Sequence, residues 1–451
     1  MDVSELEGRL NDFDPQKRAA ALAELVSLTE SGQILLPPPT CVANMHCHTF
    51  FSYNAYGYSP SSLAWLAKSR GYRLLGVVDF DVLDAVDEFL DTCELLELRG
   101  SAGIETRVYL PQYARREINS PGEPGVSYHM GIGFTTGRVP ESVAPILDDL
   151  RGRARNRNLQ VMQRVNAYLG PVNVDYEDDV LPLTPAGSAT ERHLVVAYLQ
   201  AAERTVSDLA GFWADKLKLS CEQVDALLND SPRLQNRVRK SLMKRGGVGY
   251  VEPGSDSFPT VESYHQLILG CNALPCVTWL DGTSAGERGM EELLDLLVSQ
   301  GAVALNIVPD RNWNITDPAL KALKLRKLYQ VVELAQAWDL PLNVGTEMNS
   351  YGQKLVDDFD APELAPMREA FVDGAHFIYG HTMMQRALGM GYQSDWAKRH
   401  LPSRRERSAL YARLGATLPP GKPGLTMLAA VNLKMTPEQL LEQLTSDEVH
   451  D

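Results

Sequence analysis

Residues 41–52 of the chain read Cys41-Val42-Ala43-Asn44-Met45-His46-Cys47-His48-Thr49-Phe50-Phe51-Ser52. The apolar first part predicts a short buried strand that ends in a His-x-His pair. Side chains two positions apart on an extended strand point to the same side, so His46 and His48 can bind one ion. Imidazole binds zinc, iron and manganese, so the pair indicates a transition metal without identifying it. Two unrelated histidines at a strand end are the alternative.

Apolar strands and helical segments alternate outward from this stretch. We expect helices over 60–70, 82–98, 287–299 and 318–338, and strands over 41–46, 73–79, 101–109, 126–134, 273–280, 302–308 and 341–347. Alternation of this kind predicts an α/β fold with a largely parallel sheet. Seven strands whose polar ends gather together predict a barrel, and in such barrels the chemistry lies where the strands end.

The same pattern divides the chain into segments. Residues 1–39 are expected to form an N-terminal helical extension, which a run of prolines closes because consecutive prolines end a helix. Residues 40–140 supply the first part of the barrel, and residues 271–400 supply the second. Between these parts, residues 141–270 have helical periodicity and predict an insertion or lid over the barrel mouth. Residues 401–451 predict a C-terminal helical tail.

The predicted strands carry acidic residues and histidines at or near their ends. Asp79 and Asp81 follow the second strand, Glu105 lies in the third, His129 lies in the fourth, and Glu347 follows the seventh. A carboxylate buried in an apolar strand is costly unless a cation or another partner compensates it. A single histidine in an apolar strand is more often a satisfied core residue than a ligand. Together with the His-x-His pair, these residues predict a ligand set for one or more divalent ions.

Several of these motifs occur in an order and spacing typical of one enzyme family. They are His46-x-His48-Thr49 with Ser52 and Pro60, Gly76-Val77-Val78-Asp79, Gly103-Ile104-Glu105 and His129-Met130-Gly131-Ile132-Gly133. Over residues 40–350 the chain resembles the polymerase and histidinol phosphatase (PHP) family of metal-dependent phosphoesterases. The resemblance implies a distorted seven-stranded barrel that holds manganese, zinc or iron at its C-terminal strand ends. The branch that the chain resembles removes phosphates from small nucleotides or trims short RNA.

Three positions depart from the family pattern. Phe80, Trp279 and Asn349 stand where the family has histidines. With these losses the resemblance implies one or two divalent ions (Mn, Zn or Fe) in place of three. The ligands that it implies are His46, His48, Glu105, His129 and Glu347.

Other polar residues have expected roles in catalysis and substrate binding. Asp79 or Asp81 would be the catalytic group that orients a metal-bound water or accepts its proton. Arg192 and His193 lie in the first turn of a helix predicted from Ser188-x-x-Glu191, and such a turn attracts anions. Arg192 could therefore hold a substrate phosphate, and an ordinary surface arginine is the alternative. A substrate-binding role is also expected for four residues in the segments around the last two strands: Asn306, Asp310, Arg311 and Asn349.

The composition argues against some partners. There are 58 acidic residues against 43 Lys and Arg, a net charge of −15. This balance disfavours binding to duplex nucleic acid, because phosphate contacts need clustered basic side chains. The sequence has no apolar run of the length of a membrane span, and its six scattered cysteines suit reduced thiols. From its acidic first residues we expect no signal peptide. We therefore expect a cytoplasmic protein that does not bind membranes, while the oligomeric state is left open.

The function that these features favour is metal-dependent hydrolysis of a small phosphorylated metabolite or nucleotide by a metal-activated water. A hydrolase of a non-phosphate bond would use the same metal-bound water. A non-catalytic ligand-binding or regulatory protein would keep the barrel and tolerate the lost ligands. Both alternatives stay open from the sequence.

Overall fold

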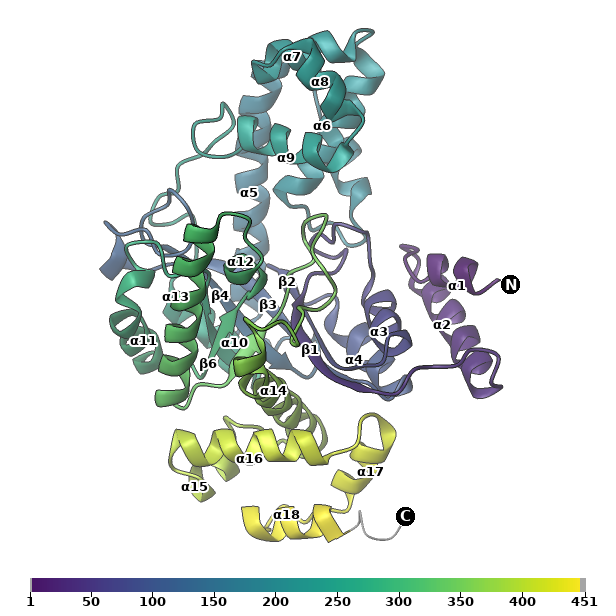
Figure 1. Ribbon diagram of the computed structural model, residues 1–451, viewed down its shortest axis with the longest axis vertical. Helices are drawn as coiled ribbons and strands as arrows, with labels where there is room; N and C mark the ends of the chain where they lie inside the picture. Colours follow the sequence, from purple (N-terminus) through teal and green to yellow (C-terminus); the bar gives the residue numbers. More distant parts are fainter. Residues whose placement is uncertain (1, 447–451) are drawn as a thin grey trace.

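The computed structural model describes residues 2–446 and contains a seven-stranded sheet that curves into a barrel (Figure 1). The strands lie in chain order: β1 (Thr40–Cys47), β2 (Tyr72–Phe80), β3 (Arg99–Tyr109), β4 (Val126–Phe134), β5 (Leu274–Trp279), β6 (Ala304–Ile307) and β7 (Leu342–Val344). Backbone hydrogen bonds from His48 N to Glu347 O and from Glu347 N to His46 O, both 2.8 Å, join the end of β1 to the segment after β7. The predicted seven-stranded barrel is confirmed.

Strand β4 runs antiparallel to both of its neighbours, whereas the other hydrogen-bonded strand pairs are parallel. The connection from β3 to β4 contains one short 3-10 turn, η1 (Pro111–Tyr113), and no crossover helix. A parallel neighbour requires a crossover connection, usually a helix. The chain therefore returns antiparallel, and the sheet is mixed. The sheet is largely parallel, as predicted, and β4 is its antiparallel strand.

Helices follow most of the other strands, in agreement with the predicted alternation. They are α3 (Pro60–Ser69), α4 (Val86–Leu95), η4 (Glu287–Gly289), α11 (Met290–Ser299), α12 (Asp310–Trp313) and α13 (Pro318–Ala337). Local sequence sets where α3 begins, because the Ser59 side chain accepts the Ser62 N–H and Pro60 occupies the first turn. The boundaries of these helices differ from the predicted ones by a few residues at most ends.

The insertion has a hydrophobic core of its own and stands apart from the barrel in Figure 1. It contains α5 (Ala144–Leu169), η2 (Tyr176–Val180), η3 (Leu181–Leu183), α6 (Glu191–Thr205), α7 (Leu209–Leu217), α8 (Cys221–Leu228) and α9 (Ser231–Leu242). The buried apolar residues of this core lie between Val161 and Met243. Helix α10 (Val261–Gly270), which we expected to end the insertion, packs on the barrel instead, because Tyr264 and Ile268 belong to the main core.

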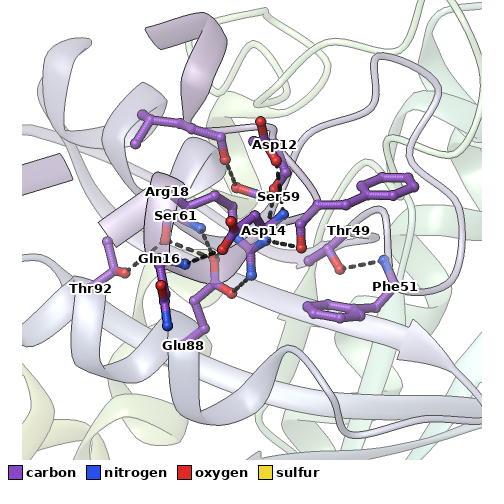
Figure 2. Close-up of polar contacts among 12 residues, drawn as sticks. Asp12, Asp14, Gln16, Arg18, Thr49, Phe51, Ser59, Ser61, Glu88 and Thr92 are labelled. Carbon is purple, nitrogen blue, oxygen red and sulfur yellow. Dashed lines mark hydrogen bonds and ion pairs between the residues drawn. The ribbon is translucent and has the colours of Figure 1, made fainter. Parts of the chain in front are cut away.

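A buried arginine fixes the N-terminal extension to the barrel (Figure 2). The extension consists of α1 (Val3–Arg9) and α2 (Pro15–Glu30). Arg18 of α2 is 3% exposed and forms an ion pair with Glu88 of α4, with Nε donating to Oε1 at 2.9 Å. Its Nη1 also donates to Asp12 O at 2.7 Å. Because a buried charge without its partner is strongly destabilising, this pair holds the extension in one position.

Helix α14 (Arg368–Leu388) contacts β1, β3, β4 and β7 on the side of the barrel away from the insertion (Figure 1). The remaining helical segments are η5 (Ala365–Met367), α15 (Asp395–His400), α16 (Arg404–Thr417), α17 (Lys422–Ala429) and α18 (Pro437–Ser446). Within residues 2–446, no helix combines the length and the apolar content that a bilayer span requires.

Three buried histidines, His193, His376 and His381, are held neutral by the fold. The His381 ring donates from Nε2 to Gly133 O at 3.1 Å and accepts the Tyr392 N–H at Nδ1 at 3.0 Å. A second proton on the ring, at Nδ1, would therefore point at the Tyr392 N–H, so the fold favours the neutral imidazole. Burial lowers the pKa of His381 to about 4, and the pKa values of His193 and His376 are also lowered by burial to about 4.

We expect the free energy of unfolding to decrease as the pH falls from about 6.5 to about 4. In this range the unfolded chain protonates the three imidazoles and the folded chain does not, so the unfolded state binds more protons. Denaturant titrations at several pH values measure the slope. His381→Asn should reduce the proton uptake on unfolding by about one proton. If the free energy of unfolding of His381→Asn changed with pH as steeply as that of the wild type, the folded chain would not hold His381 neutral.

Candidate metal centre

Two histidines and a glutamate meet in the barrel interior. His46 is in β1, His48 directly follows β1, and Glu105 is in β3. The two histidines are fully buried and Glu105 is nearly so. Glu105 Oε2 lies 3.4 Å from His46 Nε2 and 3.3 Å from His48 Nε2. One ligand atom from each residue lies within 4.8 Å of the others, so the group could hold a metal ion.

The other nitrogen of each imidazole contacts an acceptor. His48 Nδ1 lies 3.2 Å from Ser52 Oγ, and Ser52 donates its own proton to Asp79 Oδ1 at 2.5 Å. His46 Nδ1 lies 3.2 Å from Asn306 Oδ1. These acceptors place a proton on Nδ1 of each ring and leave Nε2 with a free lone pair. Contacts of this kind orient metal-binding histidines.

The position between the three converging atoms favours a positive charge. His46 Nε2, His48 Nε2 and Glu105 Oε2 are buried, and none makes a hydrogen bond to another described residue. Burial alone would raise the pKa of Glu105, but the two imidazoles hold it at about 2. Burial alone would lower the pKa of His46, but Glu105 raises it. Because buried polar groups need partners, a cation between these atoms would complete the group.

Two of the spacings in this group suit a transition metal. Ligand atoms at the usual distances from a tetrahedral zinc ion, about 2.0–2.2 Å, lie about 3.3–3.6 Å from one another. The two distances from Glu105 Oε2 to the imidazoles fall in this range. Two histidines with one carboxylate also leave further coordination positions open for iron or manganese. The donor set therefore fits one divalent ion and leaves room for a water or a substrate.

Phe80 occupies the interior position next to this group. It lies opposite Glu105 in the register of β2 and β3. Its ring stacks on His48, with centroids 4.4 Å apart and an interplanar angle of 18°. Phe80 thus forms an apolar wall beside the three ligand atoms.

The predicted catalytic role of Asp79 and Asp81 does not agree with the structure. Side chains alternate along β2, so Asp79 points away from the face that carries Phe80. Asp79 accepts Thr49 N–H at 2.8 Å, and its two oxygens also accept the hydroxyls of Thr49 and Ser52. Asp81 accepts the Thr106 hydroxyl at 2.5 Å. Asp79 is a positioning residue behind His48, and Asp81 is bound to Thr106 and, at 3.7 Å, to Arg157.

The predicted ligand His129 also lies on the outer face. In the antiparallel pairing of β3 and β4, Glu105 is opposite Met130, and His129 is opposite Thr106. A change of one residue in register reverses the face of every side chain. His129 Nε2 lies 2.7 Å from Nε2 of His265 on α10. The expectation that His129 binds the ion of this centre is therefore wrong.

Glu347 is close to the group but is bound to an arginine. Its Oε2 lies 2.9 Å from Arg311 Nη2 and accepts a longer bond from Gln353 Nε2, at 3.3 Å. Burial alone would raise the pKa of Glu347, but Arg311 and His46 lower it. The structure thus pairs the predicted ligand Glu347 with the predicted substrate-binding residue Arg311, outside the group of His46, His48 and Glu105.

The other predicted substrate-binding residues are spread around the barrel. Asn306 orients His46, so its side chain serves the metal centre. His193 accepts the Thr190 N–H at 3.0 Å and caps α6. Arg192 donates to Asn236 Oδ1 at 2.7 Å and to Ser350 Oγ at 2.5 Å, and it thereby links the insertion to the loop after β7. Asp310 accepts the Asn314 side chain at the surface, and Asn349 is half-buried two residues after Glu347.

Basic residues near the metal centre were missed by the sequence reasoning. Arg107 is two residues after Glu105 on β3, so it shares the interior face and lies about 7 Å along the strand. The Arg107 guanidinium lies 4.4 Å from the Phe258 ring, and that of Arg157 on α5 lies 4.7 Å from the same ring. Burial and the charge of Arg107 lower the pKa of Arg157 to about 10. The alternation of side chains along β3, applied from Glu105, would have indicated Arg107.

Ser52→Ala should weaken metal binding by about 10–100-fold, the usual cost of losing a residue that orients a ligand. The change removes the acceptor of the His48 Nδ1 proton and releases the ring. Competition with a metal-binding dye measures the affinity. Ser69→Ala is a suitable control, because the Ser69 hydroxyl bonds only within α3, to Leu66 O. Equal affinities of the two variants would show that Ser52 does not orient the ligand.

Comparisons with known proteins give distant similarities. No family model matches the sequence, and no curated protein matches it. An amidohydrolase structure from Chromobacterium violaceum, with bound sulfate and no metal, aligns at 14% identity and a TM-score of 0.45 over 73% of this chain and 96% of its own. A protein from Bifidobacterium adolescentis, proposed to be a metal-dependent phosphoesterase, aligns at 16% identity and a TM-score of 0.45 over 73% of this chain and 97% of its own. These similarities concern the fold and assign no residue a role.

Proposed function

We propose that this protein is a metal-dependent hydrolase of a small phosphorylated compound. The observation that carries the proposal is the buried group of His46, His48 and Glu105, in which two free imidazole lone pairs converge on a carboxylate oxygen. Nδ1 of each imidazole is bound to an acceptor, so the group has the donor chemistry of a metal site. A divalent ion held there would supply a Lewis acid and a hydroxide at neutral pH.

The basic residues support an anionic substrate. Arg107 pairs with Glu123 at 2.8 Å, whereas the carboxylate contact of Arg157 is longer, 3.7 Å to Asp81, and its Nη1 donates to Ser257 O at 3.2 Å. Two guanidinium groups close to one aromatic ring repel each other, and a phosphate between them would relieve the repulsion. Arginine also matches phosphate geometry with paired N–H donors.

Glu347 has the position and charge of a proton acceptor. Its pKa is lowered by Arg311, so the carboxylate stays ionised at neutral pH. Its backbone N–H donates to His46 O at 2.8 Å, which supports a role for Glu347 beside the metal centre. We assign Glu347 the role first expected of Asp79 and Asp81, acceptance of a proton at a carboxylate oxygen.

A panel of phosphomonoesters tests the function directly. The protein is assayed with and without added manganese, zinc and iron, beside carboxylic esters and amides of similar size. We expect phosphate release that depends on the metal. Cleavage of esters or amides alone would favour the hydrolase of a non-phosphate bond. No turnover of any substrate by metal-loaded protein would favour a binding protein.

Arg157→Gln should raise KM for a phosphomonoester by about 10–100-fold, because hydrogen bonds to charged groups contribute about 1.5–3 kcal/mol. The value of kcat should change much less, since the group acts on binding. Arg151→Gln is a matched control on the same helix, where Arg151 forms an exposed ion pair with Asp84 at 2.8 Å. A KM for Arg157→Gln equal to that of the control would contradict the role of Arg157.

A further inference from the structure

A cavity lies outside the metal centre, between the loop after β1, helix α3 and the loop after β7. Its volume is about 410 Å³, within the range of pockets that hold small molecules. The lining residues come from these three segments and from the start of β2: Tyr56, Tyr58, Leu66, Arg70, Tyr72, Met348, Gln353, Lys354, Leu355 and Val356. The ligands of the metal centre are absent from this lining.

The charge of the lining is positive, in a chain whose net charge is −15. Arg70 and Lys354 line the cavity, and no acidic residue does. Among the described residues, the Arg70 side chain has no hydrogen-bond or ion-pair partner. Lys354 lies 5.9 Å from the Trp313 ring and close enough to the buried Asp357 to affect its pKa. Two cations without a matching carboxylate in the lining favour an anionic ligand.

The lining also offers aromatic surface. Tyr56 and Tyr58 stack with ring centroids 5.7 Å apart and an interplanar angle of 22°. The Tyr56 hydroxyl accepts the Gly352 N–H at 2.9 Å, which fixes its ring against the loop after β7. The hydroxyls of Tyr58 and Tyr72 make no hydrogen bond to other residues in the described part of the chain. Ring faces with free hydroxyls suit a flat, polar aromatic ligand.

We propose that this cavity binds a nucleoside monophosphate, with its base against the tyrosine rings and its phosphate paired with Arg70 and Lys354. The volume, the aromatic rings and the two cations are separate requirements of such a ligand, and the lining meets all of them. The proposal does not depend on the proposed hydrolysis.

The cavity borders the loop that carries Glu347. Gln353 lines the cavity and donates from Nε2 to Glu347 Oε2 at 3.3 Å, while its Oε1 accepts the Ser350 N–H at 2.8 Å. Met348, the residue after Glu347, also lines it. A bound nucleotide therefore contacts the loop that carries Glu347.

Calorimetric titration of the full chain with AMP, GMP, CMP and UMP tests the proposal. The protein is kept in chelator, so that a metal-dependent site does not contribute. We expect one site for at least one of the four nucleotides, with weaker binding of its nucleoside and of inorganic phosphate. Arg70→Gln/Lys354→Gln should weaken the binding at least 10-fold, and Tyr58→Leu should also weaken it. Arg9→Gln/Lys17→Gln, which removes two exposed cations from the N-terminal helices, should bind as the wild type does.

The variant His46→Ala/His48→Ala separates this cavity from the metal centre. It should bind the nucleotide as tightly as the wild type. Binding that is lost in this variant and kept in Arg70→Gln/Lys354→Gln would place the nucleotide at the metal centre and overturn the proposal. Absence of binding for all four nucleotides would overturn it as well.

Discussion

Replacing both His46 and His48 with alanine is expected to abolish metal binding and hydrolysis together. The change removes two of the three ligand atoms that converge in the barrel and leaves Glu105 alone. A single carboxylate does not hold a transition metal in competition with water and buffer. Elemental analysis of protein purified without chelators should find about one equivalent of manganese, iron or zinc in the wild type and none in the variant.

His129→Ala is the matched control for this experiment. It removes a buried imidazole from the same sheet, on the face that points away from the metal centre. The control should keep its metal and its activity, although it loses stability because a core side chain is truncated. Absence of metal from the wild type, even after incubation with each ion, would contradict both the metal centre and the proposed hydrolase.

Gly345→Ala is expected to combine a loss of stability with a loss of metal. A Cβ at residue 345 would lie 2.4 Å from Asn44 Oδ1, 2.5 Å from His46 Cβ and 2.6 Å from His46 N. Backbone cannot yield as a flexible side chain does, so β1 and the segment after β7 must separate. We expect the free energy of unfolding to fall by about 1–3 kcal/mol. Displacement of His46 should also weaken metal binding.

Gly152→Ala provides the comparison. Gly152 lies in α5, and a Cβ there would meet no atom within 4 Å. Alanine is favoured over glycine inside a helix by about 0.5–1 kcal/mol, so this variant should be as stable as the wild type or more stable. Denaturant titrations measure both variants. A Gly345→Ala protein with unchanged stability and metal content would show that the strands tolerate the contact.

Local patterns in the sequence were enough for the strands and for the core of the site. The apolar runs predicted all seven strands, because a buried strand needs a side-chain pattern that is written into consecutive residues. Side chains two positions apart on an extended strand point to the same side, which placed His46 and His48 together at the end of the first predicted strand. The carboxylate of Glu105 stood out because an apolar strand does not bury a charge without a partner.

The sequence reasoning failed for residues whose position depends on how distant segments pair. His129 has the local pattern of a ligand, but the antiparallel register of β4 turns it to the outer face. Asp79 precedes the interior Phe80 by one residue, so its side chain points to the other face of β2. There it accepts the hydroxyl of Ser52, which contacts His48. A register is a relation between two strands, so neither strand contains it alone.

The sequence by itself determined the seven-stranded barrel, the helical character of the insertion and the two histidines with one glutamate that could hold a metal. Only the tertiary structure decided which acceptors fix the imidazole rings, that Arg311 pairs with Glu347, and that Arg107 and Arg157 meet at Phe258. The physical reason is the range of the interactions. Periodicity and burial act over a few neighbouring residues, whereas a binding site is assembled by contacts between residues that can lie hundreds of positions apart.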